Sequence, residues 1–138
     1  MKSIMSYTKL GFKIGGGSVH VSRTIMLNEL ELLLTHVNNP VATKREYLSA
    51  IIDTNCLAKR SSKTRFLTSR HLAELYSLDV NNTLFRSLLF FWHRDTNAHP
   101  LLALLCAYSR DPLLREVVPF ILNHQHGAII DRQALECK

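Results

Sequence analysis

Apolar and polar residues follow one another along most of this chain with the spacing of amphipathic helices. The clearest early stripe is spaced i, i+4, i+7, i+8 and i+11 and consists of Met26, Leu30, Leu33, Leu34 and Val37. Apolar side chains at this spacing line one face of an α-helix. The stripe predicts a helix from about Ser18 or Ser22 to Val37, ended by Asn38, Asn39 and Pro40.

A capping signal marks the start of the second predicted helix. Thr43 and Glu46 form the S/T-x-x-E box, in which each side chain satisfies a free N–H group at the helix start. The buried face of this helix is predicted to consist of Tyr47, Leu48, Ile51 and Ile52. The polar residues Asp53, Thr54 and Asn55 are expected to end it.

The third and fourth predicted helices supply much of the expected core. The third runs from about Ser62 to Leu78 and is anchored by Phe66, Leu67, Leu75 and Leu78. The fourth runs from about Val80 to Arg94, is capped by Asp79 or Asn81, and is apolar on nearly every side. Neighbours bury a helix of that composition on several faces, so we expect it to be the centre of the core. Its aromatic residues are therefore predicted to be buried rather than to stack on bases: Phe85, Phe90, Phe91 and Trp92.

Proline positions mark the last two predicted helices. The fifth begins at Asn97 to Pro100. The sixth begins with Asp111 as cap and Pro112 in its first turn, and it contains Pro119, which should kink it. Residues 128–138 are expected to begin one more short element.

The amino-terminal residues lack such a stripe. Residues 1–17 are predicted to form an irregular or partly extended arm, with a short extended piece at Lys9 to Ile14. The string GFKIGGGS nearly matches a phosphate-binding loop, but Gly17 stands where that loop needs its lysine, so we reject nucleotide hydrolysis. Residues 18–138 are predicted to form a single domain, a compact, layered, all-α arrangement of about six helices.

The composition favours an anionic partner and a reducing compartment. The formal net charge is +6, and the isoelectric point is near 9.5. Nucleic acid is the first expectation for a chain this basic. The three cysteines are far apart and form no C-x-x-C pair, which argues against disulfides and a zinc site and fits the cytoplasm. The longest apolar run, Leu101 to Tyr108, is too short to cross a bilayer, so we expect no membrane partner.

A basic cluster at the start of the third helix is the candidate binding site. It lies in the span Thr54 to Ala73, which contains no Asp or Glu. A helix amino terminus exposes N–H groups and carries a partial positive charge, so cationic and hydroxyl side chains there suit phosphate. The predicted DNA-binding residues are Lys59, Arg60, Ser61, Ser62, Lys63, Arg65 and Arg70, with Lys44 and Arg45 as flankers. The alternative is a solvated surface, because basic runs at helix starts are often no more than that.

Sequence motifs for catalysis are missing. The seven histidines form no H-E-x-x-H, the acids show no metal-ligand spacing, and there is no G-x-S-x-G. We therefore expect no enzyme activity, no metal, no cofactor and no small-molecule substrate. A catalytic group assembled across the fold stays a distant third hypothesis.

Three segments of the chain resemble one known family. They are KIGGGSVHVSRTIML, NCLAKRSSKTRFLTSRHLAELY and HPLLALLCAYSRDPLLREVV, within about Lys13 to Val118. Together they are similar to the BrxA family of bacteriophage exclusion (BREX) defence systems, once labelled putative inner-membrane proteins. The resemblance implies a small, mostly helical, cytoplasmic, non-enzymatic protein that binds double-stranded DNA beside a methyltransferase, an ATPase and a phosphatase-like partner. Family members usually have more chain after the position matching Gly127.

Two functions follow as hypotheses. The first is double-stranded DNA binding through phosphate contacts with little or no base readout. The second is a protein-interaction adaptor, whose basic face docks on another component of the defence complex. A steep salt dependence with duplex alone favours the first, and tight binding to a partner that survives moderate salt favours the second.

Overall fold

The computed structural model describes residues 2–15 and 25–136, and in these ranges it contains helices and no strand. In chain order the helices are α1 (Lys2–Lys9), α2 (Leu27–His36), α3 (Lys44–Ile52), α4 (Ser62–Tyr76), α5 (Thr83–Trp92), the 3-10 helix η1 (Thr96–Ala98), α6 (His99–Arg110), α7 (Pro112–Leu122) and α8 (Arg132–Glu136). The prediction of an all-α, layered domain is confirmed.

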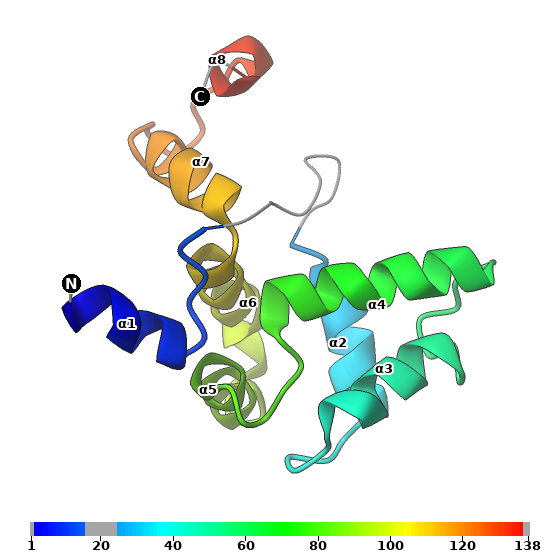
Figure 1. The fold of residues 1–138 in the computed structure, drawn as a ribbon. Coiled ribbons are helices and arrows are strands. Elements are labelled where there is room, and N and C mark those ends of the chain that lie inside the picture. Colours follow the sequence, from blue (N-terminus) through cyan, green and yellow to red (C-terminus); the bar gives the residue numbers. More distant parts are fainter. Residues whose placement is uncertain (1, 16–24, 137–138) are drawn as a thin grey trace.

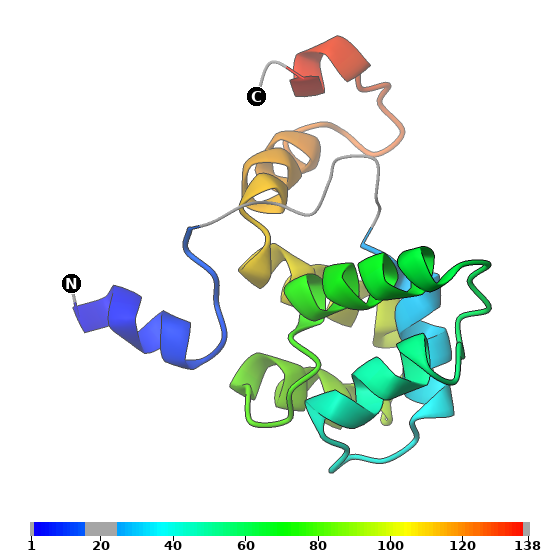
Figure 2. The same cartoon turned by 45° about the vertical axis from the view of Figure 1, so that its right-hand side comes forward.

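The helices pack in layers around α6. Helices α3 and α4 lie side by side, and α2 packs against α3 (Figures 1 and 2). On the other side, α6 packs against α4, α5 and α7. Helices α1, α7 and α8 project from this body in both views, and α7 has no buried residue.

The core lies between α2, α3, α4, α5 and α6. Its largest fully buried side chains include Tyr47, Tyr76 and Phe85. The rings of Tyr47 and Phe85 meet edge to face, with centroids 5.5 Å apart. At the α5–η1–α6 corner the ring of His99 stacks on Trp92 at a centroid distance of 3.6 Å, and His99 Nε2 lies 2.8 Å from the Trp92 carbonyl oxygen.

Local capping signals decide where several helices begin. The Thr43–Glu46 capping box at α3 is confirmed, as is the start of α7 with Asp111 as cap and Pro112 in its first turn. The cap predicted for α5 is wrong: Asn82 caps it by accepting hydrogen bonds from the N–H groups of Leu84 and Phe85. Asp79 instead accepts a hydrogen bond from the Asn81 N–H in the preceding turn, so α5 begins at Thr83 and not at Val80.

Three predictions about buried aromatic side chains are wrong. Phe66 of α4 is 57% exposed, and Phe90 and Phe91 of α5 are about half exposed. The periodicity located these helices correctly. It could not show which apolar face lacks a covering element, because that depends on how the helices are arranged. The predicted anchors Leu75, in α4, and Leu78, two residues after the end of α4, are buried.

The amino-terminal segment differs from the predicted irregular or partly extended arm, because its first part is a helix. Residues Lys2–Lys9 form helix α1, and residues 10–15 follow without helix or strand. The Leu10 carbonyl accepts a hydrogen bond from the Leu84 N–H, and the Lys13 N–H donates to the Ser109 carbonyl. The predicted start of the first long helix, at Ser18 or Ser22, lies outside the described residues; within them α2 begins at Leu27.

Gly11 is the first residue of the string GFKIGGGS, and its conformation explains why a glycine stands there. Its φ is +105°, a conformation that L side chains rarely adopt. A Cβ atom there would lie 2.1 Å from the Asn82 side chain. This glycine therefore lets the segment pass close to the start of α5.

The helices are short relative to a membrane. None of those in the described ranges is long and apolar enough to cross a bilayer.

Candidate nucleic-acid interface

The loop between α3 and α4 is built around Asn55. Its backbone is in the left-handed region, with φ of 55°. Its side chain both accepts a hydrogen bond from the Lys59 backbone and donates one to it. The Lys59 N–H donates to Asn55 Oδ1 at 2.8 Å, and Asn55 Nδ2 donates to the Lys59 carbonyl oxygen at 3.1 Å. This one side chain therefore fixes the chain just before the basic residues.

The start of α4 presents four residues that we call the α4-start cluster: Arg60, Ser61, Ser62 and Lys63. All four are exposed. The Ser61 hydroxyl caps the helix by accepting a hydrogen bond from the Thr64 N–H at 3.1 Å. The N–H groups of Ser62 and Lys63 have no partner in the described part of the chain, as expected for a first helical turn. Arg60 and Lys63 form no ion pair with any described residue.

Two of the predicted DNA-binding residues, Lys59 and Arg65, already contact other groups of the protein. Lys59 Nζ lies 3.1 Å from Glu29 Oε1 of α2, and each side chain is about a quarter exposed. Arg65 donates weakly to the Ile52 carbonyl at the end of α3, and its Nε is buried. Lys59 ties the α3–α4 loop to α2 and Arg65 ties α4 to α3, which leaves both less available to phosphate than Arg60 and Lys63.

The remaining predicted residues lie away from the α4 start. Arg70 and Lys44 line a groove beside the carboxyl-terminal half of α4, and the exposed Arg45 follows Lys44 in the first turn of α3. Arg70 follows Ser62 by eight positions, which corresponds to roughly 12 Å along the helix at 1.5 Å per residue. The structure thus divides the nine predicted residues between two ends of α4.

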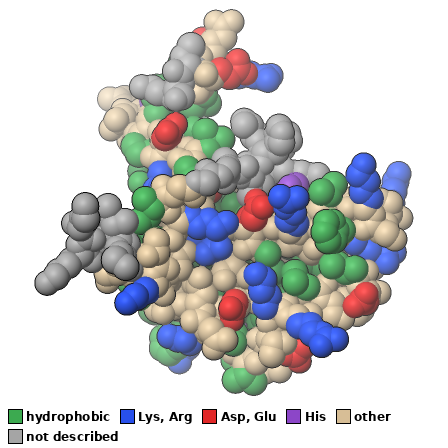
Figure 3. All heavy atoms as spheres, in the orientation of Figure 1, with side chains coloured by type: hydrophobic (Ala, Val, Ile, Leu, Met, Phe, Trp, Pro, Cys, Tyr) green, Lys and Arg blue, Asp and Glu red, His purple; other side chains and the backbone are tan. Residues whose placement is uncertain are grey.

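The groove itself, which we call the α3–α4 groove, has a volume of about 490 Å³. Its apolar lining comes from Leu48, Ile52, Phe66 and Ala73. Its charged lining consists of Lys13, Lys44, Arg70 and Arg110 against one carboxylate, Glu74. Figure 3 shows Lys and Arg side chains gathered over α3 and α4 on this face, with hydrophobic side chains between them.

Two of the groove cations were not predicted from the sequence. Lys13 comes from the amino-terminal segment and Arg110 from the end of α6. Arg110 is buried and donates to the carbonyl oxygens of Glu74, at 3.0 Å, and Gly11, at 2.7 Å. Burial, reinforced by the Arg110 charge, lowers the pKa of Lys13. No local signal marks this pair, since the two residues meet only through the fold.

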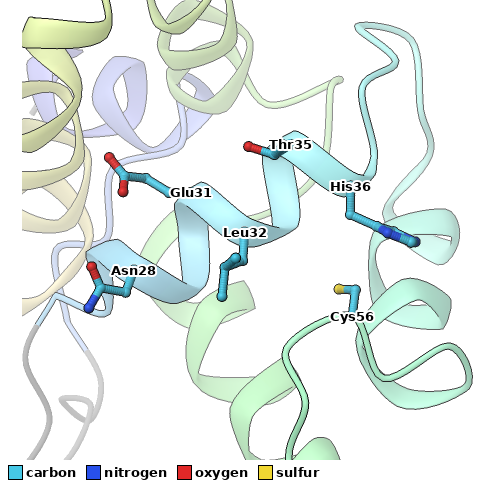
Figure 4. A pocket seen from close by; sticks show the side chains of 6 residues that line it. All are labelled: Asn28, Glu31, Leu32, Thr35, His36 and Cys56. Atoms are coloured by element: carbon cyan, nitrogen blue, oxygen red, sulfur yellow. The ribbon is translucent and has the colours of Figure 1, made fainter.

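A second hollow, of about 750 Å³, contains a histidine and a cysteine and therefore bears on the hypothesis of a catalytic site. It runs along α2 and is lined by Asn28, Glu31, Leu32, Thr35, His36 and Cys56 (Figure 4). His36 and Cys56 lie at one end, whereas Glu31 lies at the other, with its Oε1 3.4 Å from His99 Nδ1. Burial raises the pKa of the Cys56 thiol, and a nucleophilic cysteine needs the opposite shift. The hollow thus lacks the arrangement of an activated cysteine.

Metal ligands are not gathered in the described ranges either, where no group of three His, Cys, Asp or Glu side chains is placed to hold an ion. Cys56 and Cys106 are free thiols, and Cys106 belongs to the buried core. Fold and surface together define an all-α protein with a basic helix start and a separate basic groove.

Comparisons of the chain with protein-family models, with curated proteins and with solved structures find no match. The resemblance to the BrxA family therefore rests on the three segments quoted above, and membership of that family stays a prediction.

Proposed function

We propose that this chain binds double-stranded DNA through phosphate contacts made by the α4-start cluster. One observation carries the proposal: Arg60 and Lys63 are exposed beside two unpartnered N–H groups of α4 and have no carboxylate partner among the described residues. Cationic side chains, hydroxyl groups and helix amino termini are common phosphate ligands. None of these contacts reads a base edge, so the binding is expected to be nonspecific or weakly specific.

The exposed cations of α3 extend this surface. Lys44 and Arg45 lie in the first turn of α3, near the opposite end of α4. Duplex DNA carries one negative charge per roughly 1.7 Å of its axis, so a duplex that lies along α4 meets phosphates at both ends of the helix. Lys59 and Arg65 then serve mainly to hold α4 in place.

The defence role is proposed on the resemblance alone. As a BrxA-type protein, the chain would be a non-enzymatic, cytoplasmic, DNA-binding component of a BREX system, beside its methyltransferase, ATPase and phosphatase-like partners. A surface that binds duplex without choosing a sequence suits a system that must act on phage DNA of many sequences.

The test is duplex binding across a salt series for three proteins. These are the wild type, the double variant Arg60→Ala/Lys63→Ala, and a control, Arg86→Ala/Arg94→Ala, that removes the same charge from exposed positions on and just after α5. The logarithm of affinity should fall linearly with the logarithm of salt concentration. Loss of two phosphate contacts should flatten the slope by up to about 1.8, at about 0.9 per contact.

The control decides whether the site is local. The proposal requires the slope of the Arg86/Arg94 variant to stay close to that of the wild type. Equal flattening in the two variants would mean that net charge alone matters. Absence of duplex binding by the wild type at low salt would refute the proposed function.

A further inference from the structure

We infer that the α3–α4 groove binds a short acidic segment of a partner protein that presents apolar side chains to the groove floor and carboxylates to its rim. This inference goes beyond DNA binding. The α3–α4 groove shares Lys44 with the surface proposed for duplex DNA but contains no residue of the α4-start cluster.

Both α3 and α4 contribute apolar side chains to the floor of the groove. On α4, Phe66 and Ala73 are spaced i and i+7, so they lie on one face of the helix. On α3, Leu48 and Ile52 are spaced i and i+4. Phe66 is 57% exposed, a large apolar surface for a side chain in the middle of a helix. A phosphate backbone offers nothing to cover such a floor, whereas the apolar face of a peptide does.

The rim of the groove is cationic and largely uncompensated. Lys13, Lys44 and Arg110 share the end of the groove near the end of α4. Arg110 donates its hydrogen bonds to two carbonyl oxygens, those of Glu74 and Gly11, which carry no full charge. Glu74, the one acid in the lining, already lies 3.4 Å from Arg70. Asp111 is close enough to act on Lys13 but does not line the groove.

Charge complementarity therefore selects the occupant. A cationic rim around an apolar floor fits carboxylates that flank apolar residues, and it repels a basic segment. The floor from Phe66 to Ala73 spans about 10 Å, close to two turns of a partner helix. The matching segment is thus an amphipathic helix with two apolar residues one turn apart and acidic residues on both sides.

The test uses two synthetic peptides of about twelve residues that carry the same number of glutamates. One presents two leucines spaced i and i+4, and the other has glutamine at those two positions. Binding of each labelled peptide to the full chain is measured by fluorescence anisotropy at a moderate, fixed salt concentration. The leucine peptide should bind at least about fivefold more tightly, because only it covers the apolar floor.

Matched variants locate the binding. Phe66→Ser should weaken the leucine peptide about fivefold and leave the glutamine peptide unchanged. Lys44→Ala should weaken both by about two- to fivefold, as expected for a rim charge. Phe66 and Lys44 are exposed, so unchanged circular dichroism and melting are expected to show intact folding.

The Arg60→Ala/Lys63→Ala variant separates this inference from the proposed function. It should bind the leucine peptide like the wild type while losing duplex affinity. Phe66→Ser should lose affinity for the leucine peptide and bind duplex like the wild type. Equal binding of the two peptides would overturn the inference, because only general charge attraction would then remain. A Phe66→Ser variant that weakens duplex and not peptide would also overturn it and would assign the groove to DNA.

Discussion

Asn55 gives the sharpest prediction, since one side chain shapes the loop that leads into α4. Its two hydrogen bonds to the Lys59 backbone are 2.8 and 3.1 Å long and partly buried. Each contributes about 1 kcal/mol to the free energy of unfolding. The left-handed backbone, at φ of 55°, adds a cost of about 1 kcal/mol when alanine replaces asparagine.

Three substitutions separate these contributions. Asn55→Ala should lower the free energy of unfolding by about 3 kcal/mol, the sum of two lost bonds and the backbone cost. Asn55→Gly loses the same bonds but adopts the left-handed conformation freely, so its loss should be about 1 kcal/mol smaller. Asn55→Asp keeps an acceptor for the Lys59 N–H but loses the donor to the Lys59 carbonyl, and its loss should also be smaller than that of alanine.

Urea unfolding followed by circular dichroism measures all three losses at neutral pH. The order of stability, with alanine lowest, is the essential result. Loss of the same free energy in the glycine and alanine variants would refute the assigned backbone cost. Changes within about 0.5 kcal/mol of the wild type in every variant would refute the view that Asn55 holds this loop. The folded alanine variant should also bind duplex more weakly, because Arg60 then lies on a looser chain.

Three further predictions concern helix ends and the core. The hydrogen bond from the Thr43 N–H lowers the pKa of the Glu46 carboxyl, so Glu46 stabilises the fold above its ordinary pKa of about 4.5, and this stabilisation is lost as pH falls through the lower pKa of the folded state. Glu46→Gln should therefore flatten the drop in melting temperature between about pH 5 and 3, and identical pH profiles of the variant and the wild type would contradict this prediction. Phe85→Ala should cost about 3–5 kcal/mol in urea unfolding, since Phe85 is fully buried, and a loss below about 1 kcal/mol would be inconsistent with that burial. Asp111→Ala should cost about 1 kcal/mol through the lost cap of α7, with faster amide exchange at Leu113 and Leu114; unchanged exchange there would speak against the cap.

The features that could be predicted from the sequence are those whose signals are local. The capping box of Thr43 and Glu46 spans four residues, and the Asp111–Pro112 start of α7 spans two. Both signals act through backbone groups of their own first turn, so no knowledge of the fold is needed. The cap of α5 shows the limit: Asp79, Asn81 and Asn82 all suit the role, and the chain path decides among them.

The candidate site was predicted only in part, for a related reason. The positions of Arg60 and Lys63 at a helix start follow from neighbouring residues. The partner of Lys59 is Glu29, 30 residues earlier, so its ion pair could not be read from the basic run. The groove depends on Lys13 and Arg110, which only the packed helices bring together.

The bond between Arg110 and the Gly11 carbonyl has a consequence for the order of folding. It joins residues 99 positions apart, and it is supported by Leu84 bonded to Leu10 and Ser109 bonded to Lys13. Closing so long a loop is entropically costly until α5 and α6 already stand in place. On the ribosome, residues 10–13 are synthesised before the residues that they contact at positions 84, 109 and 110. We therefore expect this segment to dock late in folding and to complete one wall of the α3–α4 groove when it does.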